Sequence, residues 1–310
     1  MSFKKAQRKQ AKLRLALCGP SGSGKTYSAL LIAQGLAPQG KIALIDTERG
    51  SGELYVHLLD YDVASLTPPY TPERYIALLR EAEQAGYDVL IIDSLSHAWT
   101  GAGGVLDLHE QAATAAKGNS WAAWREVTPL HNALVDAMLG ANLHIIATLR
   151  TKTAYEVTDS DGKKKPVKVG LAPVQREGME YEFTAVLDLT IDAHIATASK
   201  DRTSLFDGKH FTPAPKTGET LREWLETGID PREESRKLLE TLKARVSAID
   251  TIPHLNNWWR KHSPEIAWLI PADRDDLTAH CATRKETLLA AAQRERGNGE
   301  DKATLTAAQG

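Results

Sequence analysis

The sequence predicts an α/β fold, in which a mostly parallel sheet carries helices on both faces, followed by a smaller all-α region. An apolar run at 13–17 leads into the glycine-rich stretch 19–26, and a helical pattern follows at once. Further apolar runs of strand length alternate with helical patterns as far as residue 228. Beyond it only helical periodicity remains, so we expect a core domain at 13–228 and a helical region at 232–295.

The composition limits the function before any motif is considered. A chain of 310 residues with 42% hydrophobic residues can bury one large core and a smaller second unit. A net charge of −2 excludes a globally basic nucleic-acid binder but allows local basic patches. The two cysteines predict neither a disulfide nor a zinc site, which suits a reducing cytosol. No apolar run approaches 18 residues, and the N-terminus has no apolar leader, so we expect no membrane span and no signal peptide.

The first predicted strand ends at a full match to G-x-x-x-x-G-K-[ST], and apolar residues at helical spacing follow as far as residue 36. This strand–loop–helix context is the one in which the motif binds a nucleoside triphosphate. Glycines let backbone N–H groups approach the phosphates, and the helix N-terminus adds partial positive charge. We expect Lys25 to reach the β- and γ-phosphates of ATP and Thr26 to hold Mg²⁺. The predicted ATP-binding residues are Gly19, Pro20, Ser21, Gly22, Ser23, Gly24, Lys25 and Thr26.

Two further buried strands, at 41–46 and 87–94, run into acidic residues, with a surface helix expected between them at 72–86. Ligands bind beyond the carboxyl ends of strands in open α/β sheets. Glu48, just past the first of these strands, is well placed to orient and deprotonate an attacking water, although an ordinary loop acid would look the same. Asp93 ends the second strand, where P-loop proteins place an acid of the Mg²⁺ shell.

The middle of the chain predicts two flexible segments around a helix and a strand. The glycine- and alanine-rich stretch 100–119 is expected to be partly unstructured. A helix at 120–139 follows, with Ser120 as its N-cap, and then a strand at 142–149.

A basic hairpin is predicted at 151–172, because Asp161-Gly162 separates two extended runs. Its lysines could follow a phosphate backbone or could simply be solvated. Together with two lysines near these loops they are the DNA-binding candidates, namely Lys117, Lys152, Lys163, Lys164, Lys165 and Lys168.

Two more strands, at 183–191 and 193–198, lead to Lys200 and Arg202. Strand alternation points these two cations the same way. They could reach the γ-phosphate of a neighbouring subunit as arginine-finger elements, or they could form a surface charge pair. Turns and a short helix at 205–228 close the core.

The C-terminal part predicts helices at 232–249, 251–262 and 273–294. Trp258 and Trp259 stand beside basic residues, so they could stack on bases, although packing within a helical bundle is the simpler interpretation. The polar stretch 296–310 is expected to be disordered. The basic arm 1–12 could contact nucleic acid or could be a solvated terminus.

The order of these predicted elements along the chain, with two flexible loops and a final Lys-x-Arg, resembles that in the core of RecA-type recombinases. The stretches GPSGSGKTYSALLIAQGL, IDTERGSGELY, IIDSLSHAW and VGLAPVQREGMEYEF more closely resemble phage and prophage RecA-like ATP-binding proteins of the AAA family. Some of these proteins are associated with single-strand annealing or recombination. The resemblance covers about residues 12–228.

The resemblance implies a Mg²⁺-dependent ATPase with roles at matching positions. Glu48 would be the catalytic base and Asp93 the acid of the Mg²⁺ shell. Thr148 and Arg150 would form the γ-phosphate sensor region. Lys200 and Arg202 would act in trans, and the two flexible loops would line a DNA channel.

The expected partners are single-stranded DNA, further copies in a ring or filament, and a single-strand-binding or annealing protein in the cytosol of a bacterial host. One alternative is an ATP-switched loader with little hydrolysis, although a pure switch does not need a general base such as Glu48. Another is a small-molecule kinase, which would need an arginine-rich lid. Only Arg150, Arg176 and Arg202 are candidates for that lid.

Overall fold

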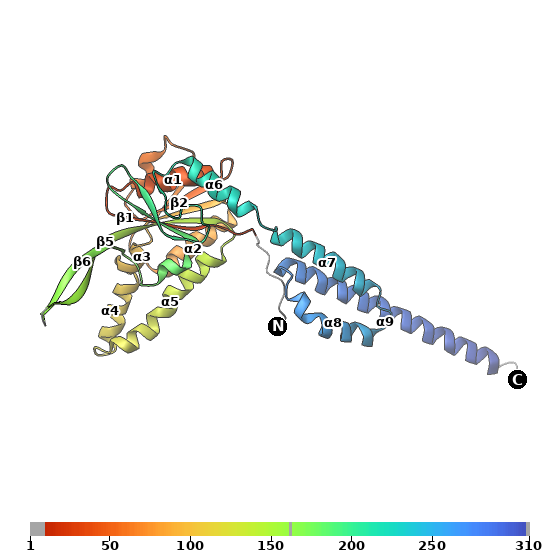
Figure 1. Ribbon diagram of the computed structural model, residues 1–310. Coiled ribbons are helices and arrows are strands. Elements are labelled where there is room, and N and C mark those ends of the chain that lie inside the picture. The colour runs from red at the N-terminus through yellow and green to blue at the C-terminus, as the bar shows by residue number, and fades with distance from the viewer. Residues whose placement is uncertain (1–9, 161–162, 308–310) are drawn as a thin grey trace. The chain divides into compact units, whose positions relative to one another are not determined.

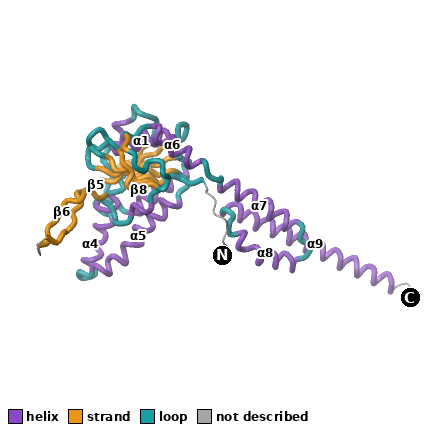
Figure 2. The backbone as a smooth tube through the Cα atoms, in the orientation of Figure 1, coloured by secondary structure: helices purple, strands orange, loops and turns teal. Residues whose placement is uncertain are grey.

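The computed structural model describes residues 10–160 and 163–307, and these divide into two compact units (Figure 1). The first unit is Ala11–Leu225, and the second contains the chain from Glu226 onward together with Gln10. Figure 2 shows that strands are confined to the first unit and that the second consists of helices. Most of the predicted N-terminal arm, at 1–9, lies outside the described residues.

The first unit is built on a mixed sheet with the strand order β3-β2-β4-β5-β1-β7-β8-β9. The strands from β3 to β7 in this order are all parallel, β8 and β9 add antiparallel pairings, and β6 pairs with the far part of β5. The bounds are β1 Arg14–Gly19, β2 Ile42–Asp46, β3 Asp62–Ser65, β4 Val89–Asp93, β5 His144–Ser160, β6 Lys163–Pro173, β7 Ala185–Leu189, β8 Ala196–Asp201 and β9 His210–Phe211.

Helices cover both faces of this sheet because its central strands are apolar on both sides. Alternate residues of β1 enter two separate cores: Leu15 and Leu17 pack with α1 (Lys25–Leu36) and α6 (Pro215–Glu226), while Ala16 packs on the opposite face. There Tyr75 and its neighbours from α2 (Pro72–Gln84) and residues of α5 (Ser120–Gly140) complete the core. Figures 1 and 2 show α1 and α6 on one side of the sheet and α5 on the other. The predicted α/β fold is therefore confirmed.

The contact between α1 and α6 depends on two glycines. A Cβ at Gly35 of α1 would lie 1.8 Å from the carbonyl oxygen of Pro215, and a Cβ at Gly218 of α6 would lie 2.0 Å from that of Ile32. Both distances are far below van der Waals contact, so only glycine lets the two helix backbones approach this closely. The close approach fixes α6 over the helix that follows the P-loop.

The segment 100–119, predicted to be partly unstructured, is mostly helical. It contains the end of α3 (His97–Thr100) and all of α4 (Val105–Ala115), which packs along α5. Its alanine, leucine, glutamate and glutamine residues are good helix formers, and the glycines that suggested flexibility lie just outside the helix ends. The N-cap of α5 is also one residue earlier than predicted, since the Asn119 side chain accepts a hydrogen bond from the N–H of Ala122.

The predicted basic hairpin is present as the antiparallel pair β5–β6, whose register runs from Thr151 opposite Pro173 to Ser160 opposite Lys163. Its turn at 161–162 lies outside the described residues. The strand predicted at 193–198 is β8, which begins only at Ala196, because Ala193 and His194 form a turn with positive φ.

The second unit contains α7 (Pro231–Ser247), α8 (Ile252–Ile266) and α9 (Pro271–Ala307) around a small apolar core. Trp258 and Trp259 are half-buried against this core, and Trp258 stacks on His262, so packing explains both tryptophans. The helix α9 continues to Ala307 where we expected disorder from 296: no proline follows its first residue, and the helix runs through Gly297 and Gly299. No helix among the described residues is both long and apolar enough to cross a membrane.

The glycine contact between α1 and α6 can be tested by substitution. Helix propensity alone predicts that Gly35→Ala would stabilise the protein by about 0.5–1 kcal/mol. We expect the opposite sign, a loss of about 2 kcal/mol or more in the free energy of unfolding in urea, because the new methyl group overlaps backbone atoms of α6. Gly140→Ala in α5 is the matched control: a Cβ there meets nothing within 4 Å, so this variant should be neutral or more stable. Equal stability of the two variants would contradict the packing described.

Candidate nucleotide-binding and catalytic site

Parallel pairing brings the polar ends of four strands into one row. Asp46 of β2 lies opposite Asp93 of β4, and Leu17 of β1 lies opposite Thr148 of β5. Gly19, where the P-loop begins, lies opposite Arg150. The residues that the sequence predicted for ATP and Mg²⁺ therefore share one edge of the sheet, as expected for ligand sites in open α/β folds.

The P-loop between β1 and α1 has the open backbone that a phosphate group needs. Gly22 and Gly24 both have a φ of 80°, in the left-handed region that favours glycine. Nothing lies within 4 Å of a Cβ built on Gly22, whereas a Cβ on Gly19 would lie 2.4 Å from Ser23 Oγ. The buried Ser23 hydroxyl has no hydrogen-bond partner among the described residues. A glycine-rich loop with open space at Gly22 and an unsatisfied buried hydroxyl at Ser23 fits a triphosphate.

Lys25 lies at the start of α1 with its ammonium turned back onto the P-loop. Its Nζ donates to the carbonyl oxygen of Pro20 at 2.8 Å. Burial lowers the pKa of Lys25, and the nearby carboxylates of Asp93 and Glu48 oppose this shift. Anionic phosphates would oppose it further, so the site is suited to hold a charged lysine against a nucleotide.

Asp93 is the buried acid on which the site is assembled. Asp93 is only 2% exposed. Its carboxylate accepts hydrogen bonds from Thr26 Oγ1 at 2.6 Å and from Thr148 Oγ1 at 2.5 Å. Burial raises the pKa of Asp93, and these two hydrogen bonds oppose the shift.

The pairing of the Thr26 hydroxyl with this carboxylate fits the predicted Mg²⁺ site in its donor chemistry. The described residues contain no group of three or more His, Cys, Asp or Glu side chains that could hold a metal ion on their own. A Mg²⁺ ion would therefore depend on Thr26, on Asp93, and on phosphate and water oxygens, which is how Mg²⁺ commonly binds with nucleotides.

The loops after β2 and β4 are joined by a hydrogen-bond network that the sequence did not reveal. Thr47 Oγ1 lies 2.7 Å from His97 Nδ1 and 3.1 Å from the carbonyl oxygen of Asp93, and it accepts from the N–H of Ser94 at 2.8 Å. The Asp46 carboxylate accepts from the N–H groups of Glu48 and Gly50 at 2.6 and 2.7 Å. These bonds fix the position of the backbone that carries Glu48.

Glu48 forms a two-pronged ion pair with Arg150. Arg150 Nε donates to Glu48 Oε1 at 2.9 Å, and Arg150 Nη2 donates to Oε2. Burial raises the pKa of Glu48, but the hydrogen bonds and charge of Arg150 outweigh burial, so the pKa lies below its usual range. Glu48 is thus a carboxylate at neutral pH. The predicted base and the predicted sensor are direct neighbours, although 102 residues separate them in sequence.

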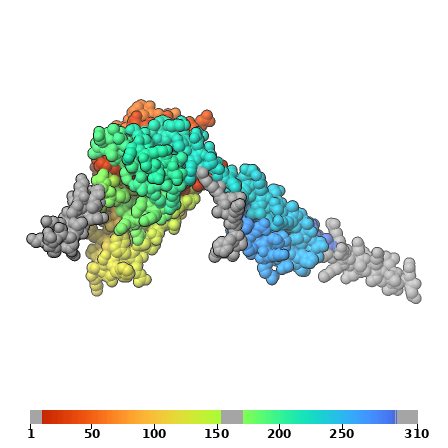
Figure 3. Space-filling view, in the orientation of Figure 1, coloured from red at the N-terminus to blue at the C-terminus, as the bar shows by residue number. Residues whose placement is uncertain are grey.

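Lys200 and Arg202 do not lie at the P-loop of their own chain. Lys200 is opposite Val186, near the beginning of β7, whereas the P-loop adjoins the end of that strand at Leu189. Lys200 Nζ and Arg202 Nη2 both donate to the carbonyl oxygen of Tyr181, at 2.7 and 2.8 Å, in the short helix η2 (Met179–Glu182). In the space-filling view the segment between β6 and α6, coloured green to cyan, covers much of the visible face of the first unit (Figure 3).

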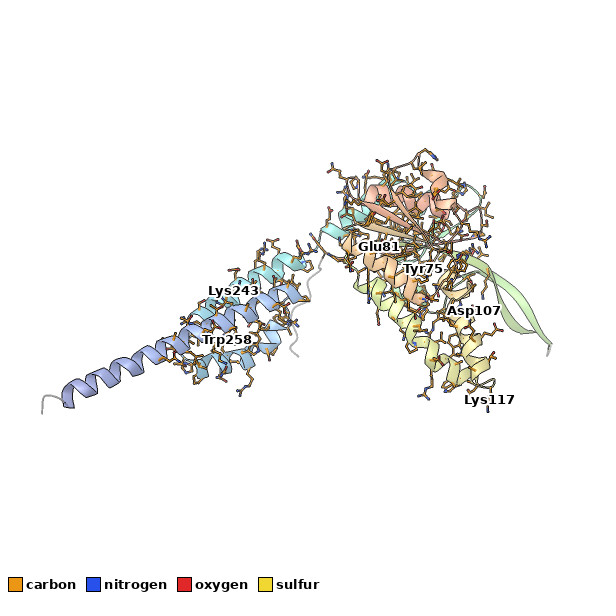
Figure 4. The ribbon with its side chains drawn as sticks, turned by 180° about the vertical axis from the view of Figure 1, so that it is seen from behind. Tyr75, Glu81, Asp107, Lys117, Lys243 and Trp258 are labelled. Atoms are coloured by element: carbon orange, nitrogen blue, oxygen red, sulfur yellow. The ribbon has the colours of Figure 1, made fainter. Side chains whose placement is uncertain are left out.

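The candidate DNA-binding lysines have separate locations. Lys117 is exposed in the turn between α4 and α5, at the far end of that helical pair (Figure 4). Lys152 is exposed at the root of the β5–β6 hairpin. The side chains of the other four candidates lie outside the described residues, so only their backbone positions on β6 are known, namely those of Lys163, Lys164, Lys165 and Lys168.

The raised pKa of Asp93 leads to a prediction for the protein without nucleotide. A carboxyl whose pKa is raised on folding contributes fully to stability below its unfolded pKa of about 3.9 and loses that contribution as the pH rises through the folded pKa. The neutral amide in Asp93→Asn does not titrate. We therefore expect Asp93→Asn to unfold at a higher temperature than the wild type at pH 7.5, with a difference that shrinks toward pH 4.

The exposed Asp207 provides the control, since Asp207→Asn should leave the midpoint of thermal unfolding unchanged. A lower midpoint for Asp93→Asn at pH 7.5 would show that the hydrogen bonds to the ionised carboxylate outweigh the cost of its burial.

The chain resembles one protein family and a set of solved structures. The model of the AAA domain family matches residues 11–218, which include the P-loop, Asp93 and Arg202. Among solved structures, that of the RadB recombinase is similar, with 16% sequence identity, a TM-score of 0.33, and coverage of 67% of this chain and 90% of that chain. No curated protein matches the chain. Because the family match spans more than half of its length, the chain belongs to the AAA domain family.

Proposed function

We propose that this chain is a RecA-like, Mg²⁺-dependent ATPase that acts on single-stranded DNA as part of a homo-oligomer. The observation that carries the proposal is the buried Asp93 carboxylate, which accepts a hydrogen bond from Thr26 of the P-loop helix. This contact joins the phosphate-binding motif to an acid in the position that Mg²⁺-nucleotide sites require. The match to the AAA domain family supports nucleotide binding and hydrolysis in general.

In this proposal the first task of the site is to hold the triphosphate. The N–H groups of the P-loop and the N-terminus of α1 face the phosphates, and Lys25 contributes a full positive charge. Thr26 and Asp93 would hold Mg²⁺, which when bound would neutralise part of the phosphate charge. Thr148 orients Asp93 through its hydroxyl.

Glu48 is the residue that we assign to proton transfer. Its lowered pKa keeps it unprotonated at neutral pH, as a general base requires. Arg150 occupies only part of the hydrogen-bonding capacity of the carboxylate, because a carboxylate offers about four lone-pair sites. Glu48 can therefore orient a water while Arg150 holds it in place. A γ-phosphate would compete with Glu48 for Arg150, which accounts for the proposed sensor role of Arg150.

Lys200 and Arg202 cannot serve the nucleotide of their own chain from the far end of β7. A role in ATP hydrolysis therefore requires that a neighbouring subunit brings its P-loop to them. Arg202 is exposed, so its guanidinium is accessible to such a neighbour. Cations supplied in trans are common in P-loop enzymes, where they stabilise charge that develops during phosphoryl transfer.

DNA would contact the elements that extend beyond the carboxyl ends of the sheet. The β5–β6 hairpin prolongs β5, and the α4–α5 pair follows β4, so both begin near the ATP site. The hairpin sequence carries Lys163, Lys164 and Lys165, while the net charge of the whole chain is −2. The electrostatic contact with DNA would therefore be local.

The proposal is tested by measuring ATP hydrolysis by the full chain with and without single-stranded DNA. We expect turnover that DNA stimulates, that Lys25→Ala abolishes, and that Arg202→Ala lowers by about 10³-fold or more, as for a trans arginine. Lys209→Ala is the control, since this exposed cation lies outside the predicted site and should be dispensable. Wild-type turnover in Arg202→Ala would contradict the trans assignment. Turnover without any response to DNA would favour an ATP-switched loader instead.

A further inference from the structure

The turn between β7 and β8 has an unusual backbone. Ala193 and His194 have φ angles of 52° and 51°, so two successive residues with side chains adopt the left-handed conformation. Positions with left-handed φ angles usually hold glycine, asparagine or aspartate, because other side chains are disfavoured there. Conformations of this kind persist only where the surrounding structure imposes them, and they are frequent at functional sites.

Hydrogen bonds from two neighbouring segments hold this turn. Thr190 Oγ1 donates to the carbonyl oxygen of Asp192 at 2.7 Å and accepts from the N–H of Ile195 at 3.2 Å. Thr212, beyond β9, donates from its hydroxyl to the carbonyl oxygen of Ala193 at 3.2 Å. The turn is thus held by one residue of its own loop and by one residue beyond β9.

The result of this geometry is that the His194 imidazole lies against the P-loop. A Cβ built on Gly24 would be 3.1 Å from His194 Nδ1 and 3.4 Å from its Cγ. The contact follows from the topology, since β7 runs parallel to β1 and the turn after β7 adjoins the loop after β1. His194 is exposed, and its ring nitrogens form no hydrogen bond within the part of the chain that the structure describes.

We propose that His194 is a further nucleotide-contacting residue, which forms a wall of the P-loop and hydrogen-bonds to an oxygen of the bound nucleoside di- or triphosphate. Gly24 presents no side chain, so the imidazole is the nearest side chain on that side of the loop. A histidine ring can donate a hydrogen bond from either nitrogen, according to its tautomer or charge. The inference rests on nucleotide binding at the P-loop, and it assigns His194 to binding rather than to proton transfer.

The test is to measure the affinity of Mg·ATP and Mg·ADP by calorimetry for His194→Gly and His194→Asn, together with thermal unfolding without nucleotide. We expect both nucleotides to bind about tenfold more weakly, which corresponds to the loss of one hydrogen bond to a charged group. Unfolding should occur at the same or a higher temperature, because glycine and asparagine tolerate left-handed φ angles. A merely structural role would not produce these opposite effects.

Ala193→Gly is the matched control, since it relieves the same backbone strain and keeps the imidazole. Its affinity should stay within twofold of the wild type. Equal affinities of His194→Gly, His194→Asn and the wild type would overturn the assignment of His194 alone. If the wild type bound neither nucleotide more tightly than Lys25→Ala, nucleotide binding at the P-loop would fail, and the role of His194 with it.

Discussion

The hydrogen bonds from two threonines to the buried Asp93 carboxylate are the interaction on which the rest of the site depends. Thr26 comes from the first turn of α1 and Thr148 from β5, so one carboxylate joins the P-loop helix, β4 and β5 at a single point. Burial makes the charged form of Asp93 costly, and the two hydroxyl groups offset part of that cost. Burial of the ionised carboxylate is therefore unfavourable without a ligand, but it suits a bound cation. This is expected of a residue whose role is in binding and not in the stability of the fold.

The parallel strands also separate two groups of charged residues. Lys25, Glu48, Asp93 and Arg150 share the carboxyl edge of the sheet. The antiparallel return of β8 carries Lys200 toward the opposite end of β7. One chain therefore presents a nucleotide site at one end and two cations at the other. In the proposed homo-oligomer this arrangement would suit head-to-tail contacts, which generate either rings or filaments.

Local sequence patterns were sufficient to predict the central strands and the P-loop, because apolar runs and glycine spacing are local signals. They failed for α4, whose alanine- and glycine-rich sequence suits both a helix and a loop, and for β3, a strand of four residues that are not buried. The Glu48–Arg150 pair and the contact of His194 with Gly24 were beyond prediction. Each joins residues more than 100 positions apart, and only the order of strands in the sheet brings them together.

The most direct test of the account is the Mg²⁺ dependence of ATP binding in the wild type and in Thr26→Val. Valine keeps the shape of threonine but cannot hold the metal or bond to Asp93. Thr114→Val on α4, whose hydroxyl donates to the carbonyl oxygen of Glu110 in the same helix, serves as the control. We predict that Mg²⁺ tightens ATP binding at least tenfold in the wild type and in the control, and that Thr26→Val loses this gain. An undiminished Mg²⁺ effect in Thr26→Val would contradict the assignment of the Thr26–Asp93 pair as the metal site.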